Sequence, residues 1–129
     1  RFGYHKAFSL TMRPRQRRAQ EQTGDSMIVR TWHGCVPVAM GDAFAGHLRK
    51  TGEDHAKSVD GNLGVAVKRM TFRGWEHFFF ATWWDSLEAI KAFAGESYQL
   101  AVHYPDDERF ELVADPYVFH HKVDQITPL

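Results

Sequence analysis

Three histidines are the residues of this sequence best suited to acid–base chemistry, and one of them, His103, is also a candidate for iron binding. His103 closes an apolar segment that ends at Pro105, and His33 and His120 fall within predicted strands. An imidazole exchanges protons near neutral pH and can also ligate haem iron. A histidine at the end of a helix is also often structural, because that terminus favours a positive charge. His103 is therefore the first catalytic candidate, and His33 and His120 are the other two.

Aromatic side chains could enclose a small apolar site near these histidines. Acid–base catalysis on a small apolar molecule needs an apolar slot, a neutral base and one or two hydrogen-bond donors. The candidate walls are Trp32, Phe80, Trp84 and Phe93, and the candidate donors are Tyr104 and Tyr117. Packing in the core or in a dimer interface is the alternative role of each ring, because large aromatic residues dominate both.

Other classes of site lack their sequence signatures. The chain has no P-loop, no dinucleotide-binding fingerprint and no nucleophile elbow. His120 and His121 are neighbours on a predicted strand and point to opposite faces, so they cannot chelate one ion together. The run 53–55 is predicted to be a solvated charge cluster in a loop. We therefore expect no metal and no prosthetic group, unless His103 ligates haem.

The predicted elements follow the order β-α-β-β-α-β, the split ferredoxin-like arrangement of an α+β domain. Strands are expected at 27–34, 63–72, 75–84 and 116–123, with a short extended segment at 108–113. Alternation in the second strand predicts that Leu63, Val65 and Val67 share one face. Arg73 and Gly74 are predicted to form a two-residue hairpin turn after it.

Two helices are predicted to cover this sheet. Asp42 is expected to cap the first, which continues loosely over 53–59. Asp85 is expected to cap the second within a capping box. A further short helical turn over 98–102 is expected to place His103 at its end.

The third predicted strand requires cover on both faces. It contains six tryptophan and phenylalanine residues between positions 75 and 84, so neither face suits water. Helices can cover only one face of a four-stranded sheet in this topology. We therefore predict a homodimer in which two sheets pack face to face.

Composition bounds the remaining possibilities. The 129 residues fit one domain at 27–124, with an N-terminal extension at 1–26 and a tail at 125–129. The extension carries six basic and two acidic residues, and we expect an expression-derived or variable arm. The rest of the chain is then net acidic, which argues against nucleic-acid binding. A lone Cys35 and the lack of a long apolar run predict a cytoplasmic protein that does not insert in membranes.

Several short motifs resemble one known family. They are Trp84-Asp85-Ser86, Glu88-Ala89-Ile90, Ala92-Phe93-Ala94-Gly95, Ala101-Val102-His103-Tyr104-Pro105 with Asp107, and Gly61-Asn62-Leu63-Gly64. Together they resemble the antibiotic biosynthesis monooxygenases, from about Ile28 to Val123. Members are small ferredoxin-like domains that pair into dimeric α+β barrels. The resemblance implies a homodimer with a pocket between each sheet and its helices.

The resemblance implies two branches of activity. In the haem-degrading branch, a histidine at the position of His103 ligates iron, together with a tryptophan where this chain has Phe93 and an asparagine on the first strand. None of residues 31–33 is asparagine. Of the three residues used in that branch, this chain therefore has only the histidine, His103. The other branch oxidises an aromatic or quinol-like molecule with O₂ and no cofactor, and this is the function we predict. Haem binding or degradation through His103 is the first alternative, and a non-catalytic ligand-binding or stress-associated domain is the second.

Overall fold

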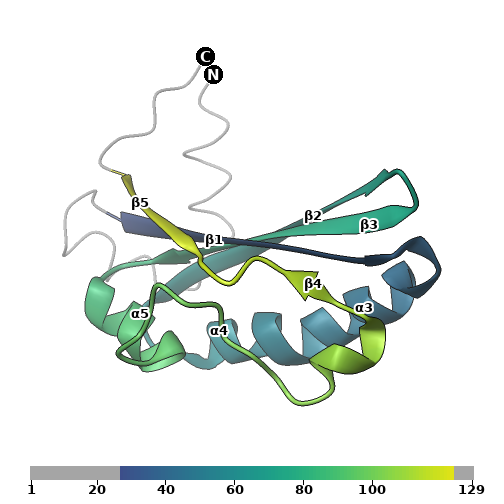
Figure 1. Cartoon of the computed structure of the whole chain (residues 1–129). Helices are drawn as coiled ribbons and strands as arrows, with labels where there is room; N and C mark the ends of the chain where they lie inside the picture. Colours follow the sequence, from purple (N-terminus) through teal and green to yellow (C-terminus); the bar gives the residue numbers. More distant parts are fainter. Residues whose placement is uncertain (1–26, 124–129) are drawn as a thin grey trace.

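One antiparallel sheet carries the structure, and helices cover one of its faces (Figure 1). The computed structural model describes residues 27–123, so the predicted extension and tail lie outside the described residues. The strands are β1 (Met27–Pro37), β2 (Asn62–Phe72), β3 (Trp75–Trp84), β4 (Val113–Ala114) and β5 (Phe119–Val123). Their order in the sheet is β2-β3-β1-β4. β5 pairs with the beginning of β1 and β4 with its end, so these two short strands together form the fourth strand of the sheet.

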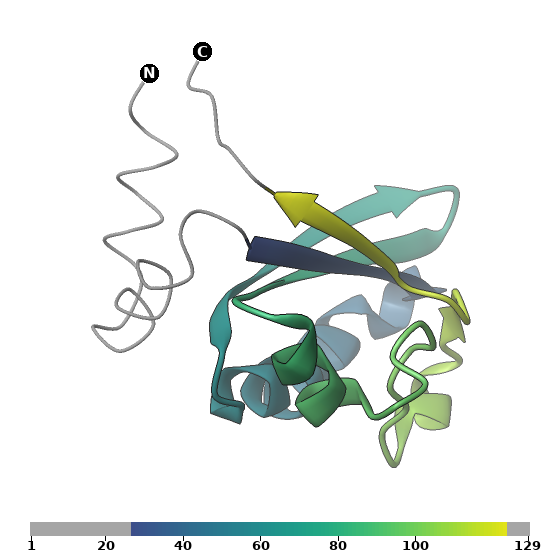
Figure 2. The same cartoon turned by 90° about the vertical axis from the view of Figure 1, so that its left-hand side faces the viewer.

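The helical segments lie together beneath the sheet, as the two views show (Figure 2). They are η1 (Val38–Met40), α3 (Gly41–Leu48), a π-helical turn η2 (Arg49–Glu53), α4 (Asp54–Ser58), α5 (Leu87–Ala94) and η3 (Asp107–Phe110). The segments from α3 to α4 form one continuous run between β1 and β2, and α5 follows β3. This is the predicted ferredoxin-like α+β fold, with β-α-β-β-α-β order.

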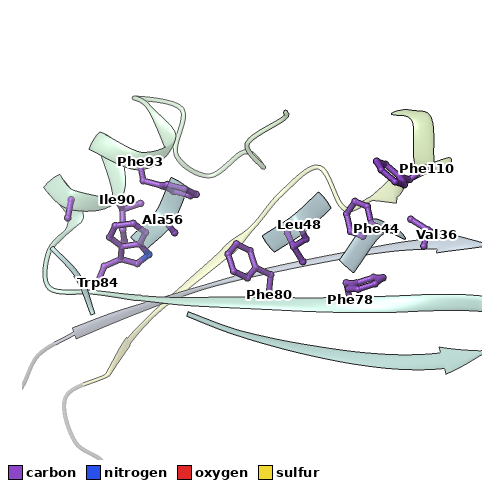
Figure 3. Packing of buried hydrophobic residues seen from close by; sticks show 11 residues of the cluster. Val36, Phe44, Leu48, Ala56, Phe78, Phe80, Trp84, Ile90, Phe93 and Phe110 are labelled. Atoms are coloured by element: carbon purple, nitrogen blue, oxygen red, sulfur yellow. The ribbon is translucent and has the colours of Figure 1, made fainter. Parts of the chain in front are cut away.

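The core lies between the sheet and these helices. Pairing of β1 with β3 sets Trp32 opposite Phe80 and Arg30 opposite Thr82, and all four side chains share the face toward the helices. Figure 3 shows the buried cluster spread along this face, from Trp84 beside α5 to residues near α3 at the far end. The members labelled there are Val36, Phe44, Leu48, Ala56, Phe78, Phe80, Trp84, Ile90, Phe93 and Phe110.

The opposite face of the sheet is apolar and exposed. Phe72, Phe79 and Phe119 are 53%, 40% and 64% exposed, and Met70 and Trp75 lie beside them. No element within residues 27–123 covers these side chains. A face of this composition is typical of an interaction surface.

Both predicted helix caps, Asp42 and Asp85, are wrong. The hydroxyl of Ser86, rather than the Asp85 carboxylate, accepts the N–H of Ala89 at 3.1 Å and caps α5. α3 begins at Gly41 without a side-chain cap, and the Asp42 carboxylate instead accepts a hydrogen bond from Arg69. Ion pairing across to β2 has replaced local capping at this position.

Of two predictions about the strands, one needs correction and one is confirmed. A β-bulge between Asn62 and Gly64 turns Leu63 to the face of the sheet away from the helices, where it is buried against Met27, while Val65 packs with the main core. The extra residue of a bulge reverses the alternation on one side of it. The predicted hairpin turn is confirmed, because Arg73 and Gly74 both have positive φ, at 51° and 82°.

Candidate active site

A small cavity lies between the sheet and the helices. It has a volume of about 50 Å³, which is room for a few water molecules. Its lining consists of Arg30, Trp32, Phe44, Leu48, Thr51, Gly52, Phe80, Thr82, Phe93, Val102, Tyr104, Asp107, Leu112 and Val118. Most of this surface is apolar, with a few polar groups that converge on it, as in many small-molecule sites.

Arg30 brings a positive charge to the cavity wall. Its side chain is only 4% exposed. Nη1 donates to the carbonyl of Tyr98 at 2.5 Å and contacts Nε2 of His120 at 3.1 Å, and Nη2 donates to the carbonyl of Leu100 at 3.1 Å. Burial lowers the pKa of Arg30 to about 10, against the opposing effect of Tyr104. The guanidinium therefore stays charged at neutral pH and is held rigidly.

A histidine–tyrosine pair forms a second polar feature. Nδ1 of His55, on α4, lies 2.8 Å from the hydroxyl of Tyr104, which lines the cavity. The His55 ring packs on Phe93, with ring centroids 4.5 Å apart. Burial lowers the pKa of His55, and burial also raises the pKa of Tyr104 to about 12, with Arg30 opposing. The pair is therefore a neutral imidazole joined to a protonated phenol, which is suited to relay a proton.

A second histidine holds the segment that carries Tyr104. Nε2 of His47, on α3, lies 2.7 Å from Oδ1 of Asp107, and Oδ2 of Asp107 accepts the backbone N–H of Tyr104 at 2.9 Å. His47 also packs against Phe110. This arrangement fixes the loop against α3 and so positions the Tyr104 hydroxyl.

The π-helical turn supplies the floor of the cavity. Thr51 and Gly52 line it, and a Cβ atom at Gly52 would lie 3.1 Å from Leu48 and 3.3 Å from Phe80. Single π-helical turns are frequent at functional sites, because the extra residue re-aims part of a helix. Here it brings backbone close to the aromatic wall.

Four of the predicted site residues line this cavity: Trp32, Phe80, Phe93 and Tyr104. Trp84 does not, because its ring is fully buried in the core and its Nε1 donates to Thr82. His120 lies behind Arg30 and not on the cavity wall. Burial, with smaller effects from Arg30 and His121, lowers the pKa of His120 to about 4.

His103 does not line the cavity. The expected helical turn over 98–102 is wrong: the segment is irregular, with Leu100 bridged to Tyr117 and the Ala101 N–H donated to the carbonyl of Pro116. Val102 and Tyr104 face the cavity on either side of His103, whose own side chain is exposed. The chemical role predicted for His103 stays a prediction without a pocket beside it.

The remaining two candidates lie on the other side of the sheet. His33 and Tyr117 line an open hollow of about 310 Å³ on the exposed apolar face, together with Phe79 and Phe119. His33 contacts Asp115 through Nδ1 at 3.1 Å and His77 through Nε2 at 2.9 Å. This hollow is larger, and Trp32 and Phe80 contribute to its lining as well. It lies where a partner subunit is expected, so we take the cavity between the sheet and the helices as the candidate site.

The most informative polar residues of the site, Arg30 and His55, were missed from the sequence. An arginine within an apolar strand was a usable signal for Arg30, since buried charges are rare without a role. His55 lies on a helix and not in the predicted solvated loop. Within residues 27–123, no three histidine, cysteine or acidic side chains gather to hold a metal ion. No helix in that range could cross a membrane.

Comparison with known proteins supports the fold. No protein-family model matches the chain, and no curated protein matches it. Among solved structures, the chain is similar to a Bacillus cereus protein provisionally described as an antibiotic biosynthesis monooxygenase. The TM-score is 0.51 at 22% identity, over 80% of this chain and 96% of the other. The likeness shows that the two proteins share a fold, in agreement with the resemblance in the sequence.

Proposed function

We propose that this protein is a monooxygenase that oxidises an aromatic or quinol-like small molecule with O₂, in the cavity between sheet and helices and without a prosthetic group. The observation that carries the proposal is the 2.8 Å contact between His55 and Tyr104 at the cavity wall. The shared fold with the Bacillus cereus protein agrees with it. Trp32, Phe80 and Phe93 supply the aromatic walls. These side chains must move apart to admit an aromatic ring, because the cavity of about 50 Å³ has room for only a few water molecules.

The proton chemistry follows from the two protonation states. A phenolic substrate donates its proton to the Tyr104 oxygen while Tyr104 passes its own proton to Nδ1 of His55. His55 is neutral and can accept it, whereas the high pKa of Tyr104 keeps that side chain from holding the charge itself. Arg30 adds a fixed positive charge to the cavity wall, which favours a bound molecule that carries negative charge, because a cation acts strongly in a desolvated site.

The oxidation step needs no further reagent. The phenolate transfers an electron to O₂, and the resulting radical pair joins to form a ring peroxide. The peroxide O–O bond then breaks. One oxygen atom stays on the ring, and the other leaves as water with the displaced ring hydrogen and the hydroxyl proton. The substrate phenol becomes a quinone, and the electrons that it loses reduce both atoms of O₂.

We further propose that the protein works as a homodimer joined through the exposed sheet face. Phe72, Phe79 and Phe119 on that face give the partner an apolar surface to cover. Such a dimer leaves the cavity of each subunit on the outer, helical side of its sheet. We also keep the prediction of a cytoplasmic location.

Haem does not fit the residues present. The cavity of about 50 Å³ is far smaller than a macrocycle, and its lining within residues 27–123 includes no histidine. His103, the predicted iron ligand, is exposed and outside it. We therefore place no step of the proposed reaction on haem.

The direct test is turnover of quinols and polycyclic phenols under ¹⁸O₂, followed by mass spectrometry of the product. The proposal expects O₂ uptake that depends on the protein and one labelled oxygen atom in the quinone. A non-catalytic binding domain would bind the same compounds without O₂ uptake, and that outcome would overturn the proposal. Metal-depleted protein should retain full activity.

A further inference from the structure

Among residues 27–123, Arg30 is a buried cation that has no counter-ion. Its three hydrogen bonds go to the carbonyls of Tyr98 and Leu100 and to the ring of His120, all of them uncharged acceptors. No carboxylate pairs with it within residues 27–123. Arg69 shows the usual arrangement in the same protein, because it pairs with Glu76 at 2.8 Å and with Asp42 at 3.0 Å.

An unpaired charge at this depth is unfavourable in the free protein. Burial of a single ion remains costly even after the structure around it relaxes. His120 does not offset it, because that ring is neutral at pH 7 and acts as an acceptor. Proteins usually keep such a group only when a ligand or a partner supplies the opposite charge.

The geometry leaves the guanidinium free to bind. A guanidinium has five N–H groups, and three are used in the contacts above, so two remain for a ligand. Arg30 lines the cavity, and its Cζ atom lies 5.5 Å from the centroid of the Phe93 ring. A planar ligand held against Trp32, which also lines the cavity, would bring its edge to the guanidinium. Two parallel N–H donors match the two oxygens of a carboxylate.

We propose that the cavity binds its substrate as an organic anion, an aromatic molecule whose carboxylate group pairs with Arg30. This inference rests on the proposed function for the identity of the cavity as the substrate site. It adds a substrate class: aromatic acids rather than neutral phenols. The carboxylate is the anchor, and the hydroxyl that is oxidised lies toward Tyr104.

Binding of two small isosteres tests the inference without turnover. Benzoate and benzamide have nearly the same shape, but only benzoate is charged at neutral pH. Titration calorimetry should show benzoate binding at least about tenfold more tightly, which corresponds to about 1.4 kcal/mol. Equal affinities, tighter binding of benzamide or no binding of either compound would overturn the proposal. Binding of inorganic phosphate as tightly as benzoate would also overturn it, because the ring would then contribute nothing.

Two substitutions locate the effect. Arg30→Gln should abolish the preference for benzoate, whereas Arg69→Gln, which removes an already paired arginine, should leave it unchanged. If Arg30→Gln does not fold, Arg30→Lys keeps the charge but loses the fork, and the preference should fall and not vanish. A preference that survives fully in either Arg30 variant contradicts the proposal. Selective benzoate binding without oxidation of any phenol would uphold this inference while the proposed function fails.

Discussion

Nδ1 of His55 lies 2.8 Å from the hydroxyl oxygen of Tyr104, although 49 positions separate the two residues in the chain. The contact joins α4, in the first helical run, to the irregular segment after α5. It exists because both segments cover the same face of the sheet. The cavity between them therefore depends on the whole fold and not on one local motif.

The proposed base predicts how activity depends on pH. Because burial lowers the pKa of His55 from its ordinary value of 6.5, the imidazole is neutral at pH 7 and loses activity only when protonated in acid. We expect kcat/KM to be flat above pH 6.5 and to fall below it. His55→Gln should lower activity by about 10²-fold or more and remove this acid limb. An unchanged profile in the variant would exclude His55 as the base.

His120 predicts how stability depends on pH. Its folded pKa of about 4 lies below the ordinary value of 6.5, so between these two pH values the unfolded chain binds a proton that the folded chain does not. The free energy of unfolding should therefore fall as the pH falls from 6.5 toward 4. His55 acts in the same direction.

Replacement of His120 by glutamine measures how much this histidine contributes to the pH dependence of the free energy of unfolding. The amide oxygen of His120→Gln can still accept from Arg30 but does not titrate. Chemical denaturation should show a shallower loss of stability in acid for the variant, with little difference from the wild type well above pH 6.5. Identical slopes in the two proteins would show that His120 is not shielded from protonation in the folded state.

Gly52 and Gly46 form a matched pair for the cavity floor. A methyl group at Gly52 would press on Leu48 and Phe80, whereas one at Gly46 meets nothing within 4 Å. Gly52→Ala should therefore narrow the cavity and weaken aromatic ligands several-fold. Gly46→Ala should leave binding unchanged and raise stability by up to about 1 kcal/mol, because alanine favours a helix. Calorimetry and thermal unfolding measure both. Equal binding by the two variants would place the ligand elsewhere.

The exposed sheet face makes a prediction about assembly. Charged residues at two of its aromatic positions, as in Phe79→Glu with Phe119→Glu, should convert the dimer to a folded monomer. Val38→Glu is the control, since Val38 is also exposed but follows β1 in η1. Light scattering after size-exclusion chromatography reports the mass. A monomeric wild type, or a double variant that remains dimeric, would contradict the proposed interface.

Much of the fold was predictable because its signals are local. β3 runs from Trp75 to Trp84 as predicted, because a long aromatic run beside a hairpin turn can form little else. Gly95 ends α5 with a φ of 89°, as its position after an amphipathic helix indicates. The bulge that reverses Leu63 was not predictable, because it depends on the register of β2 against β3.

The site was harder to predict because long-range contacts define it. The sequence pointed to aromatic walls, and three of the four predicted wall residues line the cavity. It also pointed to His103, but the pairing of 99–101 with 116–118 makes that segment irregular and turns His103 outward. The contact between His55 and Tyr104 could not be predicted, because the two residues lie 49 positions apart and no short sequence motif contains both.

Two tyrosines permit a direct test of whether the cavity between the sheet and the helices is the active site. Tyr104 lines that cavity, and Tyr117 lines the open hollow on the other side of the sheet. Loss of one hydroxyl in Tyr104→Phe should lower the rate of O₂ uptake by about 10²-fold, and Tyr117→Phe should keep the wild-type rate. The opposite pattern, with Tyr117→Phe inactive and Tyr104→Phe active, would contradict the account and move the chemistry to the other face of the sheet.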